Sequence, residues 1–93
     1  MTVAVLSVEL HLPLAGSLKD KRQVLRRLKD RLHGQNVAVA EVEYQDLWQR
    51  AGLGIATVGA SDRAAEQTLA AALDLIERLE PGLVTASHME FVR

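Results

Sequence analysis

The sequence alternates between two hydrophobic periods, and the order of these periods restricts the fold more than any other feature. Stretches in which apolar and polar residues alternate predict half-buried strands, and stretches with apolar residues every three or four positions predict amphipathic helices. The patterns give the order strand, helix, strand, strand, helix, strand. The predicted strands are Val3–Leu12, Val37–Tyr44, Leu53–Val58 and Leu83–Val92, and the predicted helices are Ser17–His33 and Arg63–Leu79.

Two strand–helix–strand units in succession predict an α+β fold of the ferredoxin-like type. In this β-α-β-β-α-β sandwich, four antiparallel strands form one sheet and both helices cover one of its faces. Because the chain has 93 residues, it has room for one domain, and residues 1–93 are predicted to form a single one.

The helix predicted at Ser17–His33 concentrates the positive charge of the chain. It carries seven of the 11 Lys and Arg residues and two of the 12 acids, so its net charge is +5 in a chain whose total is −1. At about 100° per residue, one stripe of this helix contains bases and no acid. Lys21 falls instead in the apolar sector, so we expect its stem to follow the core and its ammonium to reach out.

This concentration of bases predicts a surface that neutralises phosphate groups. The candidate nucleic-acid-binding residues are Lys19, Lys21, Arg22, Arg26 and Lys29. The alternative is a solvated helix face, balanced by acids elsewhere in the chain.

The sheet face away from the helices is the second candidate surface. We expect it to carry Val5, Ser7, Glu9 and His11 from the first strand and Leu53, Ile55 and Thr57 from the third. On the second strand, we expect Ala38, Ala40, Val42 and Tyr44 to face the helices, and Val37 and Val39 to face away. The resulting apolar patch favours a homodimer, and the lack of aromatic residues argues against base stacking on the sheet.

The segment Gln45–Arg50 contains the only Trp of the chain and is too long for a two-residue hairpin turn. Asp46, Trp48 and Arg50 are therefore a candidate partner-binding loop. The alternative, which we favour, is that Trp48 folds back as a lid on the core while Asp46 caps a short turn.

Catalytic chemistry has little support. The absence of Cys excludes disulfides, thiolate metal sites and cysteine nucleophiles. Glu9, His11, His88 and Glu90 would meet if the first and last strands were neighbours, but an exposed polar face produces such patterns by chance. We therefore predict no catalytic residue, no metal site and no cofactor, and a protein that is not an enzyme.

The start of the chain lacks the pattern of a signal peptide, and no apolar run approaches the roughly 18–20 residues that cross a bilayer. We therefore expect a cytoplasmic protein that does not bind membranes.

Three segments resemble the YlxP-like family of small bacterial proteins of unknown function. They are ELHLPLAGSLKDKRQVLRRLKDRL, NVAVAEVEYQDLWQRAGLGIA and the helix that begins near Asp62. The combination of SLKDKR with a later EVEYQDLWQRA is the most specific part. The resemblance implies a ferredoxin-like fold and a gene placed beside translation initiation and ribosome maturation factors. It implies no catalytic residue.

Together, these features predict a non-enzymatic binding module that docks on structured RNA or on a ribosomal particle through its basic helix. The alternative is a small homodimeric regulatory or scaffold protein. Such a protein would bind another protein or a metabolite through the open sheet face and the Trp48 loop.

Overall fold

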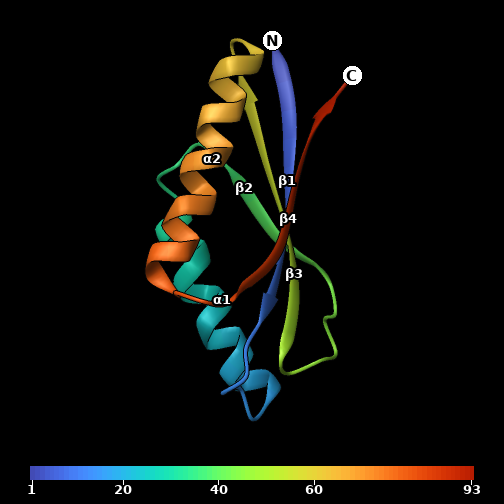
Figure 1. The fold of residues 1–93 in the computed structure, drawn as a ribbon, viewed down its shortest axis with the longest axis vertical. Helices are drawn as coiled ribbons and strands as arrows, with labels where there is room; N and C mark the ends of the chain where they lie inside the picture. The colour runs from blue at the N-terminus through green and yellow to red at the C-terminus, as the bar shows by residue number, and fades with distance from the viewer.

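The computed structural model describes residues 1–93 and has the predicted order of elements (Figure 1). The strands are β1 (Thr2–His11), β2 (Ala38–Glu43), β3 (Arg50–Gly59) and β4 (Val84–Val92), and the helices are α1 (Leu18–Leu32) and α2 (Asp62–Leu79). The element bounds differ from the predicted ones by no more than a few residues. β3, for example, begins at Arg50 rather than at Leu53.

The four strands form one antiparallel sheet in the order β2-β3-β1-β4, so β2 and β4 are its edges. Both helices lie on the same side of this sheet, α2 along its upper part and α1 along its lower part as drawn in Figure 1. This arrangement confirms the predicted ferredoxin-like α+β fold.

The hydrophobic core fills the space between the sheet and the two helices. Its β1 side chains come from alternate positions, as the period of the sequence predicted. The largest apolar side chains that are fully buried in this core are those of Val8, Leu10, Leu28, Leu32, Leu53, Ile55, Leu69 and Ile76. The helices are therefore held on the sheet by the burial of their leucine-rich faces.

Both helices begin at a serine cap. The Ser17 Oγ accepts a hydrogen bond from the backbone N–H of Asp20 at 3.1 Å, and the Asp20 carboxylate accepts one from the N–H of Gly16 at 2.9 Å. In α2, the Ser61 Oγ accepts from the N–H of Ala64 at 3.1 Å. These bonds satisfy N–H groups that have no partner within the helix. Neither helix combines the length and apolar character that a membrane crossing requires.

The predicted orientation of β3 is wrong. Leu53, Ile55 and Thr57 were expected on the open face, but they are 1%, 0% and 4% exposed and lie beneath the helices. The cause is the register of the sheet, because Leu53 pairs with Val8 and Ile55 pairs with Leu6. Residues directly opposite one another in an antiparallel pair share a face, so β3 follows the inward set of β1.

The predicted orientation of β2 is wrong for the same reason. Val39 pairs with Ile55, so Val37 and Val39 pack against the core while Ala38 and Ala40 are exposed on the other face. The middle of the open face therefore carries small residues instead of the expected large aliphatic ones.

Candidate nucleic-acid interface

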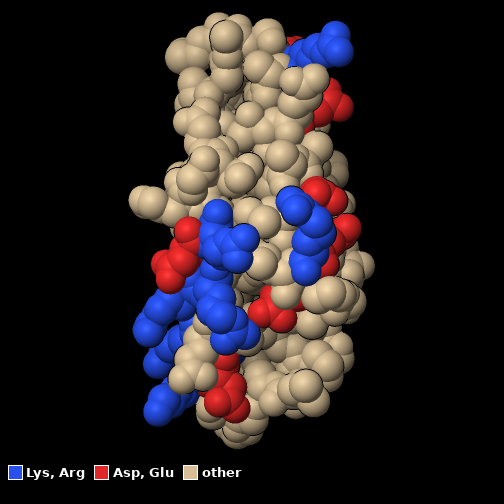
Figure 2. All heavy atoms as spheres, turned by 90° about the vertical axis from the view of Figure 1, so that its left-hand side faces the viewer, with Lys and Arg blue, Asp and Glu red and all other residues tan.

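The basic stripe of α1, defined as Lys19, Arg22, Arg26 and Lys29, lies on one flank of the helix. The first three side chains are exposed and Lys29 is half-buried. None of the four takes part in an ion pair with a carboxylate. Figure 2 shows Lys and Arg side chains gathered at the lower end of this side of the molecule, where α1 lies. The structure thus groups these four predicted residues and leaves their charges without an internal counter-ion.

Lys21 differs from the stripe, and its predicted contact with phosphate is wrong. Its side chain is 1% exposed and is among the largest buried side chains of the protein. The Nζ atom donates hydrogen bonds to the carbonyl oxygens of Tyr44 at 2.9 Å, Gln45 at 3.2 Å and Arg50 at 3.3 Å. It also forms an ion pair with the Glu41 Oε2 at 2.8 Å. Because all of its donors are engaged inside the fold, Lys21 has none left for a ligand.

The buried ammonium of Lys21 joins α1 to a segment of the chain that lies at least 20 positions further along the sequence. It links α1 to the end of β2, to the β2–β3 loop and to the first residue of β3. The Glu41 Oε2 is buried and has no hydrogen-bond partner besides this ammonium. A buried charge is tolerated only when it is paired and hydrogen-bonded, so each partner here depends on the other.

The β2–β3 loop, residues 44–49, is tied to the β1–α1 connection at the lower end of the molecule. The Gln49 side-chain amide donates to the carbonyl oxygens of Pro13 and Ala15, each at 3.3 Å. The N–H of Leu12 donates to the carbonyl of Gln49 at 2.9 Å. We call this end, formed by Leu14 and residues 44–49, the tip. Its backbone is fixed at several points.

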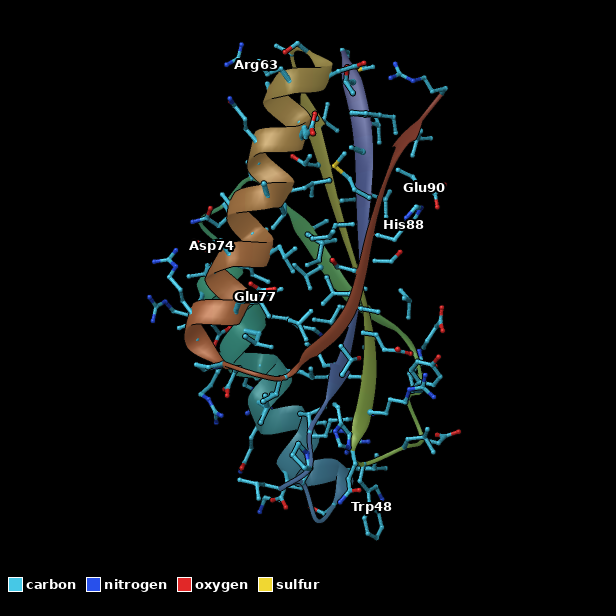
Figure 3. All side chains as sticks on the ribbon, viewed as in Figure 1. Trp48, Arg63, Asp74, Glu77, His88 and Glu90 are labelled. Carbon is cyan, nitrogen blue, oxygen red and sulfur yellow. The ribbon has the colours of Figure 1, made fainter.

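The lid predicted for Trp48 is wrong. Its side chain is 52% exposed, Leu47 is 48% exposed and Leu14 is 96% exposed, so the tip presents apolar side chains to solvent. In Figure 3, Trp48 is the lowest labelled residue and points away from the body of the protein. The structure therefore places Trp48 outside the core, where the interpretation of this segment as a partner-binding loop requires it.

Arg50 lies at the start of β3, and its guanidinium is held by two neighbours. It forms an ion pair with Glu9 at 2.5 Å and lies 4.0 Å from the centre of the Tyr44 ring. The hydrogen bond from the Tyr44 hydroxyl, followed by that from Arg50, holds the pKa of the Glu9 carboxyl below its ordinary value. The same bond to Glu9 raises the pKa of Tyr44. Arg50 is thus a cation beside the tip with two contacts that favour one position of its side chain.

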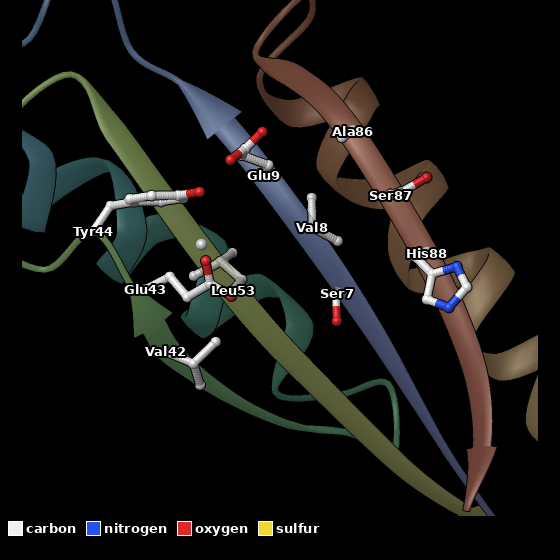
Figure 4. Close-up of a pocket in the computed structure, with 11 residues that line it drawn as sticks. Ser7, Val8, Glu9, Val42, Glu43, Tyr44, Leu53, Ala86, Ser87 and His88 are labelled. Carbon is white, nitrogen blue, oxygen red and sulfur yellow. The ribbon is translucent and has the colours of Figure 1, made fainter.

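Two hollows lie near this cluster. The tip hollow has a volume of about 450 Å³ and is lined by His11, Asp46, Leu47, Trp48, Gln49 and Arg50. It therefore brings together all three residues of the predicted partner-binding loop. The sheet hollow is smaller, about 240 Å³, and lies on the open face between Tyr44 and His88, which Figure 4 shows on opposite sides of it.

The carboxylate and imidazole groups of the open face are separate pairs. Glu9 is joined to Arg50, while the His88 Nε2 lies 3.2 Å from the Glu90 Oε1. No three His, Asp or Glu side chains converge in a way that would hold a metal ion. The open face offers single polar contacts rather than a ligand set.

Sequence reasoning missed the role of Tyr44, which lies at the rim of the open face and not under the helices. Its φ of +60° is in the left-handed region, which a non-glycine residue seldom adopts. A bulge in β2 between Glu41 and Glu43 precedes it. A bulge changes the direction of the side chains that follow, and the alternating pattern of the strand carried no sign of it.

Comparisons with known proteins place the chain in a family. Residues 3–89 match the model of a protein family of unknown function, DUF503. An uncharacterized protein of Bacillus subtilis strain 168, YlxP, is 45% identical over 64 residues, which cover 68% of this chain and 70% of the relative.

Two de novo designed proteins have a similar fold. Foldit4 superposes with a TM-score of 0.56 at 10% identity, covering 99% of this chain and 96% of its own. LFR1 1, a design with the ferredoxin fold, gives a TM-score of 0.56 at 13% identity, covering 99% of this chain and 83% of its own. These likenesses concern the fold alone, whereas the family match extends over most of the sequence. The chain therefore belongs to the DUF503 family, as its resemblance to YlxP-like proteins implied.

Proposed function

We propose that this protein is a non-enzymatic binding module of the bacterial cytoplasm that docks on structured RNA, free or within a ribosomal particle, through the basic stripe. The observation that carries the proposal is that the four cations of the stripe have no carboxylate partner. Like charges three or four residues apart on a helix repel one another, and an anionic partner removes this cost. The ribosomal context rests on the resemblance to the YlxP-like family.

The cations elsewhere in the protein support this choice of surface. Arg78 pairs with Asp74 and Arg93 with Asp62, so several charges outside α1 are compensated locally. From Lys19 to Lys29, the stripe extends over about 15 Å at the rise of an α-helix. This length suits several phosphates along one backbone, and the arginine guanidinium groups can bind phosphate oxygens in pairs.

Charge reversal on the stripe tests the proposal. The double variant Arg22→Glu plus Arg26→Glu should weaken co-sedimentation with ribosomes, and binding to an RNA hairpin at low salt, by at least tenfold. Arg63→Glu plus Arg78→Glu on α2 is the matched control, because it changes the net charge equally on another surface. Equal binding by the wild type and the α1 variant would refute docking through this helix.

A second candidate function is a homodimeric scaffold that pairs through the open sheet face. Val42, Val58 and Val92 are 53%, 54% and 57% exposed, and all three lie on this face. Exposed aliphatic side chains on one sheet face favour a partner surface. Sedimentation equilibrium should then give a dimer mass for the wild type and a monomer mass for Val58→Lys. Leu14→Lys, on the tip, should remain dimeric, and a wild type that is monomeric at all concentrations would exclude this function.

A further inference from the structure

The tip has a fixed shape although its side chains add nothing to the core. Its loop carbonyls are bound by the buried Lys21 ammonium, and its Gln49 amide bonds to the neighbouring connection. The side chains that this framework displays, Leu47 and Trp48, are about half exposed. A rigid loop that keeps an indole in solvent is typical of a prepared contact surface, because aromatic anchors lose little entropy on binding.

The tip hollow is shallow and open to solvent, and the side chains that line it suit a flat, polar-edged group. Trp48 supplies an indole ring and His11 an imidazole ring. Arg50 supplies a cation whose position is favoured by its ion pair with Glu9 and by its contact with the Tyr44 ring. Asp46 adds a hydrogen-bond acceptor. A nucleobase could use all of these contacts, because it has a face that stacks on aromatic rings and an edge that carries hydrogen-bond donors and acceptors.

The hollow lies at the same end of the molecule as the start of the basic stripe. α1 begins at the lower end in Figure 1, and Trp48 projects at the lower end in Figure 3. The bonds from Lys21 to the carbonyls of Tyr44 and Gln45 join the first turns of α1 directly to the loop. An RNA strand whose phosphates lie on Lys19 and Arg22 would therefore have its next nucleotides near the tip.

We infer that the tip hollow takes one unpaired nucleobase of the bound RNA, stacked on Trp48, while the basic stripe holds the adjoining phosphates. The inference rests on the proposed function and adds to it the class of RNA: a helix interrupted by a bulge or loop. A fully paired duplex offers no free base to the hollow, so it should bind through its phosphates alone.

Intrinsic fluorescence tests the stacking directly, since Trp48 is the only Trp of the chain. The probes are two hairpins with the same stem, one with a single bulged adenosine and one fully paired. The bulged hairpin should quench the Trp48 emission at least twofold at saturation and bind about tenfold more tightly than the paired one. Trp48→Ala should remove this preference, Trp48→Phe should retain part of it, and Arg63→Gln, on α2 and away from the tip, should leave it unchanged.

The possible failures are distinguishable. If both hairpins bind equally, the Trp48 emission does not change and the stripe variant still weakens binding, the inference is overturned and the proposed function stands. If neither hairpin binds to the wild type at low salt, both are overturned. If Trp48→Ala leaves RNA binding intact but abolishes self-association in sedimentation, the tip is a protein contact and the inference is again overturned.

Discussion

At the scale of single residues, Lys21 is the side chain on which the candidate site most depends. A lysine in the apolar sector of a surface helix ordinarily extends along the core and places its ammonium in water. Here four oxygen atoms surround the ammonium, and all come from residues at least 20 positions away. These contacts form the framework on which the tip is held.

Replacing Lys21 by Met keeps the length of the side chain and removes its charge and donors. The buried Oε2 of Glu41 and the carbonyls of Tyr44, Gln45 and Arg50 would then lose their partner. Leaving one member of a buried pair uncompensated costs about 3–5 kcal/mol. We expect Lys21→Met to lower the free energy of unfolding in urea by about that amount. Lys19→Met, on the exposed stripe, should change it by less than about 0.5 kcal/mol. Equal midpoints for the two variants would contradict a structural role for this ammonium.

The Glu9 carboxyl should titrate below its ordinary pKa of 4.5, because the Tyr44 hydroxyl and Arg50 favour its charged form. A carboxyl whose pKa is lowered by folding stabilises the protein fully above 4.5, and this contribution is lost as the pH falls through the lowered value. An NMR titration of the carboxyl measures this pKa. Tyr44→Phe should move it back toward 4.5 and Ser7→Ala should not; an unchanged titration in Tyr44→Phe would show that the hydroxyl plays no part.

At the scale of elements, the order and bounds of the helices and strands could be predicted because each depends on local residues. The caps at Ser17 and Ser61 and the inward alternation of β1 are of this kind. The faces of β2 and β3 could not be predicted, because a shift of one residue in register exchanges them. Leu53 lies inward only because it pairs with Val8, which is 45 positions away.

Gly52 lies at a close contact between β2 and β3. A Cβ built there would lie 2.8 Å from the Cβ of Glu43, across the β2 bulge. We expect Gly52→Ala to destabilise the protein by about 1–3 kcal/mol, the usual cost of overpacking. Thermal unfolding measures the effect, with Gly34→Ala as the control, because a Cβ there meets nothing within 4 Å. Similar melting temperatures for both variants would contradict this account of the β2–β3 contact.

At the scale of the whole molecule, the protein combines a net charge of −1 with one strongly positive region. Ion pairs between elements use several of the cations: Arg27 of α1 is joined to Glu80, and Arg93 is joined to Asp62. The sequence correctly predicted which helix carries the positive charge. It placed Lys21 in the apolar sector, but it could not predict that the Lys21 ammonium is buried or that Trp48 is exposed, because tertiary contacts decide both. The candidate site is therefore the basic stripe, next to the tip with Trp48 exposed.

This distribution of charge makes a quantitative prediction about salt. If the four cations of the stripe each neutralise one phosphate of an RNA duplex, the logarithm of the binding constant should fall with the logarithm of salt concentration with a slope of about −3.5. Arg22→Gln plus Arg26→Gln should reduce the magnitude of that slope by about two, whereas Arg63→Gln plus Arg78→Gln should not change it. Trp48→Ala should lower the affinity for the bulged hairpin at every salt concentration without altering the slope, because stacking releases no counter-ions. A slope that Arg22 and Arg26 do not affect would mean that RNA, if bound, contacts another face of the protein.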